Sequence, residues 1–262
     1  MKFLVSNDDG IQARGIAALA RALLPYGEVT VVAPNRERSA CSHSLTLEHP
    51  LRTAPVDFPV PVHRALSVNG TPADCVKLGL AKLMETPPDL VVAGINKGAN
   101  TTVDVFYSGT VAAAFEGVFN DVPAIAFSLA SFDHDADYSL AQTWVARTLD
   151  RILQDGPAKG FVYNVNIPYL PDSGIRGIRL TRLGNVRYRD SYELRHDPVG
   201  RPYYWLTGEP EILDQDPACD IVALREGFVS MTPIRAELTD ASVLERWRRK
   251  QEWADLASPV RP

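Results

Sequence analysis

The chain of 262 residues lacks any long apolar run. A helix that crosses a membrane needs about 20 consecutive apolar residues, so the sequence predicts no membrane span and no membrane partner. The apolar start, residues 2–5, is far too short for the core of a signal peptide, and Asp8 and Asp9 interrupt it. We therefore expect a cytoplasmic location.

Cysteine and basic charge are also scarce. Cys41, Cys75 and Cys219 are widely spaced and form no C-x-x-C pair, which argues against a zinc or redox motif and predicts free thiols. The 27 Lys and Arg residues are outnumbered by 32 Asp and Glu residues, so the formal net charge is −5. Because proteins that bind nucleic-acid polymers usually carry a basic face, no such polymer is expected as a partner.

Two common phosphate-binding motifs are missing as well. No G-x-G-x-x-G follows a predicted strand. Gly10 and Gly15 have the spacing of a Walker A motif, but Ile16 and Ala17 stand where Lys and Ser or Thr are required. The sequence therefore argues against a P-loop ATPase and against a dinucleotide enzyme.

Short apolar runs alternate with helical patterns through the first half of the chain. The predicted strands are 2–6, 28–34, 89–95, 123–129 and 161–167, and the predicted helices are 11–24, 71–84, 108–119 and 138–153. Apolar strands separated by helices of this length predict a mostly parallel, doubly wound α/β sheet that is covered on both faces.

The pattern changes after the last of these strands. Residues 175–235 contain strand-like pieces and turn signals with little helical periodicity. Residues 240–256 again have a helical pattern, with Val243, Leu244, Trp247 and Ala254 on one face. We therefore predict a core over 1–174 and a smaller, antiparallel-rich extension with a terminal helix over 175–262.

Polar residues follow several predicted strands. Asp8 and Asp9 follow the first strand, the loop 35–44 follows the second, and Asn96 follows the strand 89–95. The carboxyl ends of parallel strands share one rim, where ligands of such sheets bind. Carboxylate, hydroxyl and amide oxygens favour Mg²⁺, Mn²⁺ or Ca²⁺. The aspartate pair alone also allows a simpler interpretation, in which one residue caps the next helix and the other is solvated.

The segment Ser108, Gly109 and Thr110 opens the predicted helix 108–119. Small residues at a helix N-terminus let backbone N–H groups approach an anion, which the helix dipole also favours. Ser108 as an ordinary N-cap remains the alternative. A metal and an anion on one rim together suggest metal-assisted phosphoryl chemistry.

The ordered motifs SNDDG, VVAPNRERSACSHSLTL, SVNGTPADCV, GINKGAN and YSGTVAAAFEG closely resemble the SurE (survival protein E) family of 5'/3'-nucleotidases. The likeness continues through NVNIP, TRLG, DPVGRPYYWLTG and GFVSMTPI and so covers nearly the whole chain. This resemblance implies a Rossmann-like core and a metal-dependent phosphatase that acts on nucleoside monophosphates. It also implies a C-terminal region exchanged within a homodimer or tetramer.

The resemblance further implies one divalent ion per subunit, Mg²⁺ or Mn²⁺, with Ca²⁺ possible in crystals. The family's ligands fall on Asp8, Asp9, Ser39 and Asn96. Asp8 and Asp9 are then the candidate catalytic carboxylates. Either a water or, as the less favoured nucleophile, one of the aspartates attacks the phosphorus.

The family's phosphate contacts fall on Asn96, Ser108, Gly109 and Thr110. Departures from the family pattern occur at Ala40, Lys97, Thr101 and Thr102, and they leave the implied ligand set intact. For His43 we favour a structural hydrogen bond, and for Lys97 a solvated position over a phosphate contact. Two other functions stay open: a transferase that uses a metal-bound nucleotide, and a non-catalytic nucleotide sensor.

Overall fold

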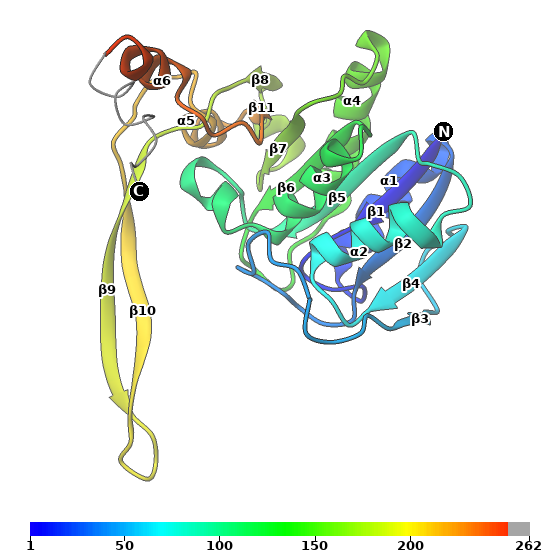
Figure 1. Ribbon diagram of the computed structural model, residues 1–262, viewed down its shortest axis with the longest axis horizontal. Coiled ribbons are helices and arrows are strands. Elements are labelled where there is room, and N and C mark those ends of the chain that lie inside the picture. The colour runs from blue at the N-terminus through cyan, green and yellow to red at the C-terminus, as the bar shows by residue number, and fades with distance from the viewer. Residues whose placement is uncertain (251–262) are drawn as a thin grey trace, which may run out of the picture.

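The computed structural model describes residues 1–250 and is built around one nine-stranded sheet (Figure 1). The strand order is β3-β4-β2-β1-β5-β6-β7-β11-β8. The strands of this sheet are β1 (Lys2–Ser6), β2 (Glu28–Pro34), β3 (Thr53–Pro55), β4 (Arg64–Val68), β5 (Leu90–Lys97), β6 (Ala124–Ala130), β7 (Val162–Pro168), β8 (Ile178–Leu180) and β11 (Val229–Ile234). Neighbours from β4 to β7 pair in parallel, whereas β3 and β11 are antiparallel to their neighbours β4 and β7.

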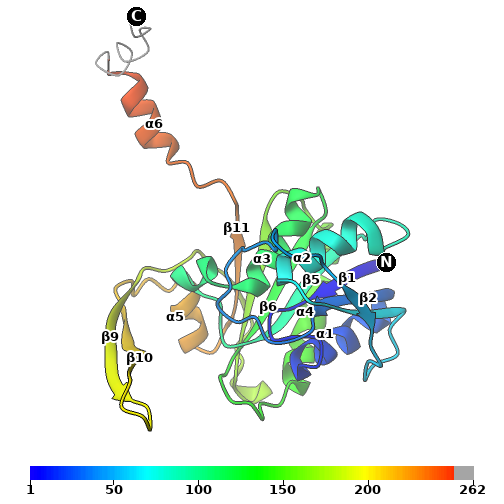
Figure 2. The same cartoon turned by 60° about the horizontal axis from the view of Figure 1, so that its bottom comes forward.

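Helices cover both faces of this sheet (Figure 2). The helices packed on the sheet are α1 (Arg14–Leu23), α2 (Pro72–Leu78), α3 (Gly109–Phe119) and α4 (Ser139–Asp155), and α5 (Asp220–Arg225) contacts β7 and β11. The last helix, α6 (Ala241–Arg248), lies apart from the sheet (Figure 2). Residues of α1 and α4 share one apolar cluster with Leu90 and Val92 of β5, and residues of α2 and α3 share the other with Val91 and Ala93. Successive side chains of a strand point to opposite faces, so the unbroken apolar run of β5 supplies both clusters. The predicted doubly wound α/β class is confirmed.

The predicted elements agree closely with the structure, and the differences have local causes. The helix predicted over 71–84 is α-helical to Leu78 and then continues as a π-helical turn, Gly79–Leu83. Thr71 caps it, since its side chain accepts a hydrogen bond from the N–H of Asp74 at 3.1 Å. Strand β4 was not predicted, because its five residues mix polar and apolar types too briefly to form a pattern.

The C-terminal region divides into two parts. Strands β8 and β11 continue the main sheet, whereas β9 (Val186–His196) and β10 (Pro202–Ile212) form a separate antiparallel hairpin that projects from the core (Figure 1). The predicted terminal helix is α6, and Ala254 of its predicted face lies outside the described residues. Across residues 1–250, no helix combines the length and apolar character needed to cross a membrane.

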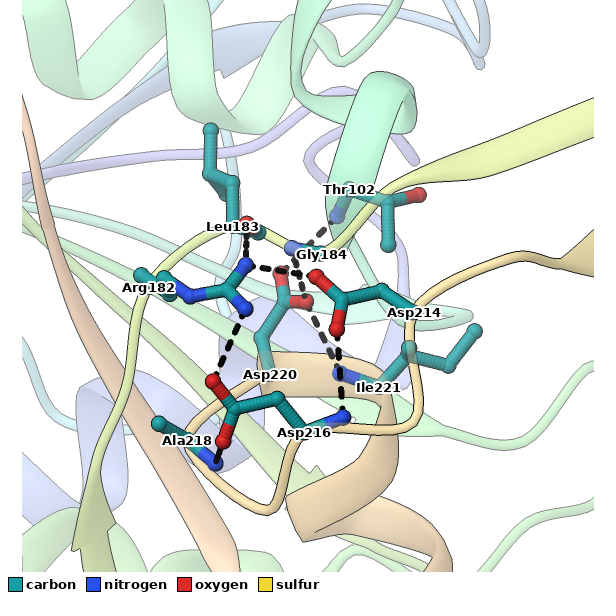
Figure 3. Close-up of polar contacts among 9 residues, drawn as sticks. All are labelled: Thr102, Arg182, Leu183, Gly184, Asp214, Asp216, Ala218, Asp220 and Ile221. Atoms are coloured by element: carbon teal, nitrogen blue, oxygen red, sulfur yellow. Dashed lines mark hydrogen bonds and ion pairs between the residues drawn. The ribbon is translucent and has the colours of Figure 1, made fainter.

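The hairpin is joined to the core by a polar cluster at its base (Figure 3). The carboxylate of Asp220 at the start of α5 accepts hydrogen bonds from the N–H groups of Thr102 (2.8 Å), Gly184 (2.9 Å) and Ile221 (2.8 Å). Thr102 and Gly184 lie 118 and 36 positions from Asp220 in the chain, whereas Ile221 is its neighbour. The buried carboxylate therefore holds the entry to β9 against the 3₁₀ turn Thr102–Phe106.

Candidate active site

Asp8 lies in the turn that ends β1, at the rim of the parallel strands. Asn7 closes this turn by donating a hydrogen bond from Nδ2 to the carbonyl of Gly10 at 2.9 Å. The buried Asp8 side chain points to the N-terminus of α3, where the Thr110 hydroxyl donates a hydrogen bond to Asp8 Oδ1 at 2.5 Å. The rim predicted from the sequence thus brings Asp8 and Thr110 into direct contact.

The start of α3 is shaped to approach Asp8 closely. Ser108 is the N-cap, and its hydroxyl accepts a hydrogen bond from the N–H of Val111 at 3.1 Å. A Cβ added at Gly109 would lie only 2.8 Å from Asp8 Cβ and 3.0 Å from Cys41 Sγ. Any side chain at residue 109 would therefore push α3 away from the aspartate, so the glycine permits the close approach.

The environment of Asp8 and Asp9 disfavours the charged forms of their two carboxyl groups. Burial raises the pKa of Asp8, and hydrogen bonds from Thr110 and Gly109 only partly offset the rise. Burial, followed by the charge of Asp8, raises the pKa of Asp9 to about 6, against the opposing effect of the Lys97 N–H, which donates to Asp9 Oδ2 at 3.0 Å. A cation between the carboxylates would relieve both effects, because it favours their charged forms.

Ser39 lies in the loop after β2, which is tied to the first turn. The N–H of Arg38 donates a hydrogen bond to the carbonyl of Asp8 at 2.7 Å. The exposed Ser39 hydroxyl itself donates to Glu37 Oε1 at 2.7 Å. The structure therefore places the Ser39 loop beside the aspartates but directs its hydroxyl to Glu37.

Asn96 lies near the end of β5, next to the residue that contacts Asp9. Its side-chain Nδ2 donates a hydrogen bond to the carbonyl of Gly98 at 2.9 Å. Lys97 Nζ lies 3.3 Å from His134 Nδ1 at an exposed position. The amide of Asn96 is thus at the rim and bonds to Gly98 rather than to either carboxylate. Lys97 lines a small pocket together with Asp9 and Glu37, so its solvated role stays a prediction.

His43 has the structural hydrogen bond predicted for it. Its Nε2 lies 2.9 Å from Glu116 Oε1, and its ring stacks on Phe119 with the ring centroids 5.5 Å apart. Lys77 Nζ contacts the other oxygen of the same carboxylate at 3.3 Å. His43 therefore packs against the side of α3, where it also lines a cavity together with Ser108.

A buried amide cluster that was not predicted from the sequence holds the loop after β5. The N–H of Asn100 donates a hydrogen bond to Asn166 Oδ1 at 2.7 Å, and its Nδ2 donates to Ser128 Oγ at 2.9 Å. Its carbonyl accepts from Nδ2 of Asn164 (2.9 Å) and of Asn166 (3.1 Å). The available signal was NVNIP, in which two amides two residues apart interrupt a buried strand.

The donor set at this rim consists mainly of oxygen atoms. Among the side chains of residues 1–250, no group of three His, Cys, Asp or Glu is placed to hold a metal ion. A cation at the rim would therefore depend on two carboxylates together with neutral oxygens. Such a set suits Mg²⁺ or Mn²⁺, whereas it lacks the nitrogen and sulfur ligands of typical zinc sites.

Comparison with known proteins agrees with this arrangement. The family model described as survival protein SurE matches residues 3–190. The chain is 50% identical over 242 residues to a protein of Moorella thermoacetica named 5'-nucleotidase SurE, covering 92% of this chain and 93% of that protein. It is 48% identical over 257 residues to a protein of the same name from Pelotomaculum thermopropionicum, covering 98% and 97%.

A solved structure is also similar. The crystal structure of the SurE protein from Aquifex aeolicus superposes with a TM-score of 0.81 at 38% identity. The match covers 94% of this chain and 98% of that chain. The likeness therefore includes the C-terminal region as well as the parallel sheet.

Proposed function

Because the chain belongs to the SurE family, we propose that it is a 5'-nucleotidase, a phosphoric monoester hydrolase that converts nucleoside monophosphates to nucleoside and phosphate. The observation that carries this proposal is the near full-length likeness to relatives named 5'-nucleotidase SurE. The contact between Asp8 and the N-terminal turn of α3 supports it, because it joins a carboxylate to a natural phosphate-binding element. Hydrolysis of 3'-nucleotides is part of the proposal.

The proposed cofactor is one Mg²⁺ or Mn²⁺ ion per subunit, held by Asp8, Asp9, Ser39 and Asn96. The raised pKa values of the two aspartates support it, since they reflect buried carboxylates that lack a compensating charge. The hydroxyl of Ser39 and the amide of Asn96 would have to turn from Glu37 and Gly98 to join them. When bound, such an ion withdraws charge from a phosphoryl oxygen.

The chain's own residues orient the reactants. The backbone N–H groups of Ser108–Thr110, with the amide of Asn96, would hold the phosphate. For this, the N–H of Ser108 would have to leave the carbonyl of Asp104, to which it donates at 3.1 Å, and those of Gly109 and Thr110 would have to be shared with Asp8. The Thr110 hydroxyl keeps Asp8 directed at the same place. Water attacks the phosphorus in line with the departing nucleoside oxygen. The phosphorus–oxygen ester bond breaks, the water loses a proton, and the departing oxygen gains one.

Phosphate release from AMP tests the activity directly. We expect turnover with Mg²⁺ or Mn²⁺, loss with a chelator and recovery when the ion is restored. Binding of Mn²⁺ measured by calorimetry provides a readout independent of turnover. A chain that binds AMP and Mn²⁺ but releases no phosphate would instead be a nucleotide sensor.

Single-turnover hydrolysis in ¹⁸O-labelled water tests the nucleophile. Direct attack by water predicts label in the first phosphate released. Label found first in an aspartate carboxyl would contradict direct attack and assign the nucleophile to Asp8 or Asp9.

The proposed assembly is a homodimer or tetramer formed through the C-terminal region 175–262. The apolar side chains on one face of the projecting hairpin support this proposal, because they have no core to pack against within the described chain. A cytoplasmic location is also proposed, and the three free cysteines agree with a reducing compartment.

A further inference from the structure

An apolar cavity of about 670 Å³ lies beside the N-terminal turn of α3. Ser108, Ala112, Phe115 and Phe119 line it along one face of α3, and residues 232–238 line the opposite wall. This volume is within the range of roughly 300–1,000 Å³ that is typical of small-molecule sites.

Hydrogen bonds hold the walls of this cavity in place. The Ser42 hydroxyl donates to the carbonyl of Phe106 at 2.6 Å, which fixes the loop after β2 against the neighbouring 3₁₀ turn. The hydroxyls of Thr181 and Thr232 lie 2.7 Å apart and join β11 to the segment after β8. The cavity is therefore part of the folded framework.

One charged group at the rim of the cavity, Arg182, is compensated, whereas Arg235 and Glu237 add a charge of each sign to the lining. Arg182 lines the cavity, and its guanidinium donates to Asp214 at 2.6 Å and to Asp216 at 2.9 Å (Figure 3). The ring of Phe106, in contrast, is 56% exposed and open to a ligand, whereas Phe119, which is 55% exposed, already stacks on His43 and Phe115. The exposed ring of Phe106 within this apolar lining suits a planar group such as a base.

We propose that this cavity binds the nucleoside of the substrate, with the base against Phe106. The inference rests on the proposed nucleotidase function, because the cavity shares Ser108 with the proposed phosphate site. The helix face from Ser108 to Phe119 spans about 16 Å at 1.5 Å per residue, which accommodates a sugar and a base. A nucleoside is neutral and its base is planar, so it matches the aromatic lining.

The test compares hydrolysis of AMP with hydrolysis of ribose 5-phosphate, which lacks the base. Phe106→Ala should lower kcat/KM for AMP about five- to hundredfold, the range that base–aromatic stacking supports, mainly by raising KM. The value for ribose 5-phosphate should stay within about twofold, because that substrate has no base to stack. The full-length chain is used with Mn²⁺ throughout.

A matched pair of leucines separates the cavity from general surface effects. Leu238 lines the cavity and is 76% exposed, whereas Leu180 is 72% exposed and lies outside it. Leu238→Ala should shift KM for AMP in the same direction as Phe106→Ala, and Leu180→Ala should not. Adenosine binding, measured by calorimetry, should weaken in Phe106→Ala and Leu238→Ala but not in Leu180→Ala.

Several outcomes would overturn the inference. If Phe106→Ala lowered kcat/KM equally for AMP and for ribose 5-phosphate, Phe106 would have only a structural role. An unchanged KM for AMP in this variant would show that the base binds elsewhere. A change in sedimentation of Phe106→Ala would assign the cavity to contact with another copy of the chain. If the wild-type protein releases phosphate from neither substrate, the nucleotidase function itself fails, and adenosine binding alone then decides whether the cavity takes a nucleoside.

Discussion

Side chains at the rim of the parallel sheet are buried against the rest of the chain, whereas side chains of the β9–β10 hairpin are exposed. At the rim, Asp8 is 4% exposed and Thr110 is fully buried, and the two are hydrogen-bonded to each other. In the hairpin, every residue of β9 after Val186 is exposed. The rim is thus completed by the chain's own fold, whereas a two-stranded hairpin is at best marginally stable without a further surface.

The exposed residues of the hairpin are not distributed evenly. Cross-strand pairing places Tyr204 opposite Leu194 and Leu206 opposite Tyr192, all on one face. The other face carries Tyr203 opposite Arg195 and Trp205 opposite Glu193. The comparison predicts that substitutions at the rim change chemistry, whereas substitutions on the apolar hairpin face change assembly.

The largest expected effect is that of Asp8→Asn at the rim. Loss of one charged ligand should reduce turnover of AMP about hundredfold or more and weaken Mn²⁺ binding, while circular dichroism shows an intact fold. Asp121→Asn is the control, because Asp121 is exposed at a φ of 57°, where asparagine is well tolerated. Full activity of Asp8→Asn would refute the proposed ligand set.

A smaller effect is expected for Gly109→Ala. The added Cβ must displace either Asp8 or the start of α3, and misplacement by about 1 Å can reduce the rate about hundredfold. We expect a ten- to hundredfold fall in kcat. Gly174→Ala is the matched control, since the nearest atom to its added Cβ lies at 3.5 Å. Equal kinetics for the two variants would show that the close approach of α3 is unimportant.

Assembly is expected to respond to Tyr204→Ala. Removal of one aromatic side chain from the apolar hairpin face should weaken self-association about tenfold, equivalent to about 1.4 kcal/mol, as measured by sedimentation. Tyr203→Ala, from the neighbouring residue on the opposite face, should leave sedimentation unchanged. If neither variant dissociates the assembly, the apolar face is not the contact surface.

The smallest expected effect concerns Glu116 and pH. Burial raises the pKa of Glu116, but the hydrogen bond from His43 and the charge of Lys77 outweigh it and lower the pKa below the ordinary value of 4.5. The group therefore stabilises the fold above pH 4.5, and this contribution is lost as the pH falls through the lowered pKa.

Urea unfolding of Glu116→Gln provides the measurement. The variant should lose about 1 kcal/mol or less near neutral pH, because His43 and Lys77 are partly exposed to solvent and their charges are screened. The difference from the wild-type protein should shrink towards pH 3. A difference that grows on acidification would reverse the assigned sign.

The apolar strands were predictable because burial on both faces leaves an unbroken hydrophobic run, as in β5. Strand β4 was not predictable, because it is defined by its pairing with β2 and not by a hydrophobic pattern of its own. The aspartate turn was also predictable, because a strand end in a parallel sheet determines its position. Asn100 and its amide partners were missed, because their contacts join residues more than 60 positions apart.

The sequence by itself determined the α/β class, the rim and the residue types that gather there, because these follow from local periodicity and strand direction. Which residues hold the metal and phosphate stays a prediction. Only the tertiary structure decided that Thr110 holds Asp8, that Ser39 faces Glu37 and that an aromatic cavity adjoins Ser108. These features depend on distances between segments far apart in the chain, which local sequence patterns do not encode.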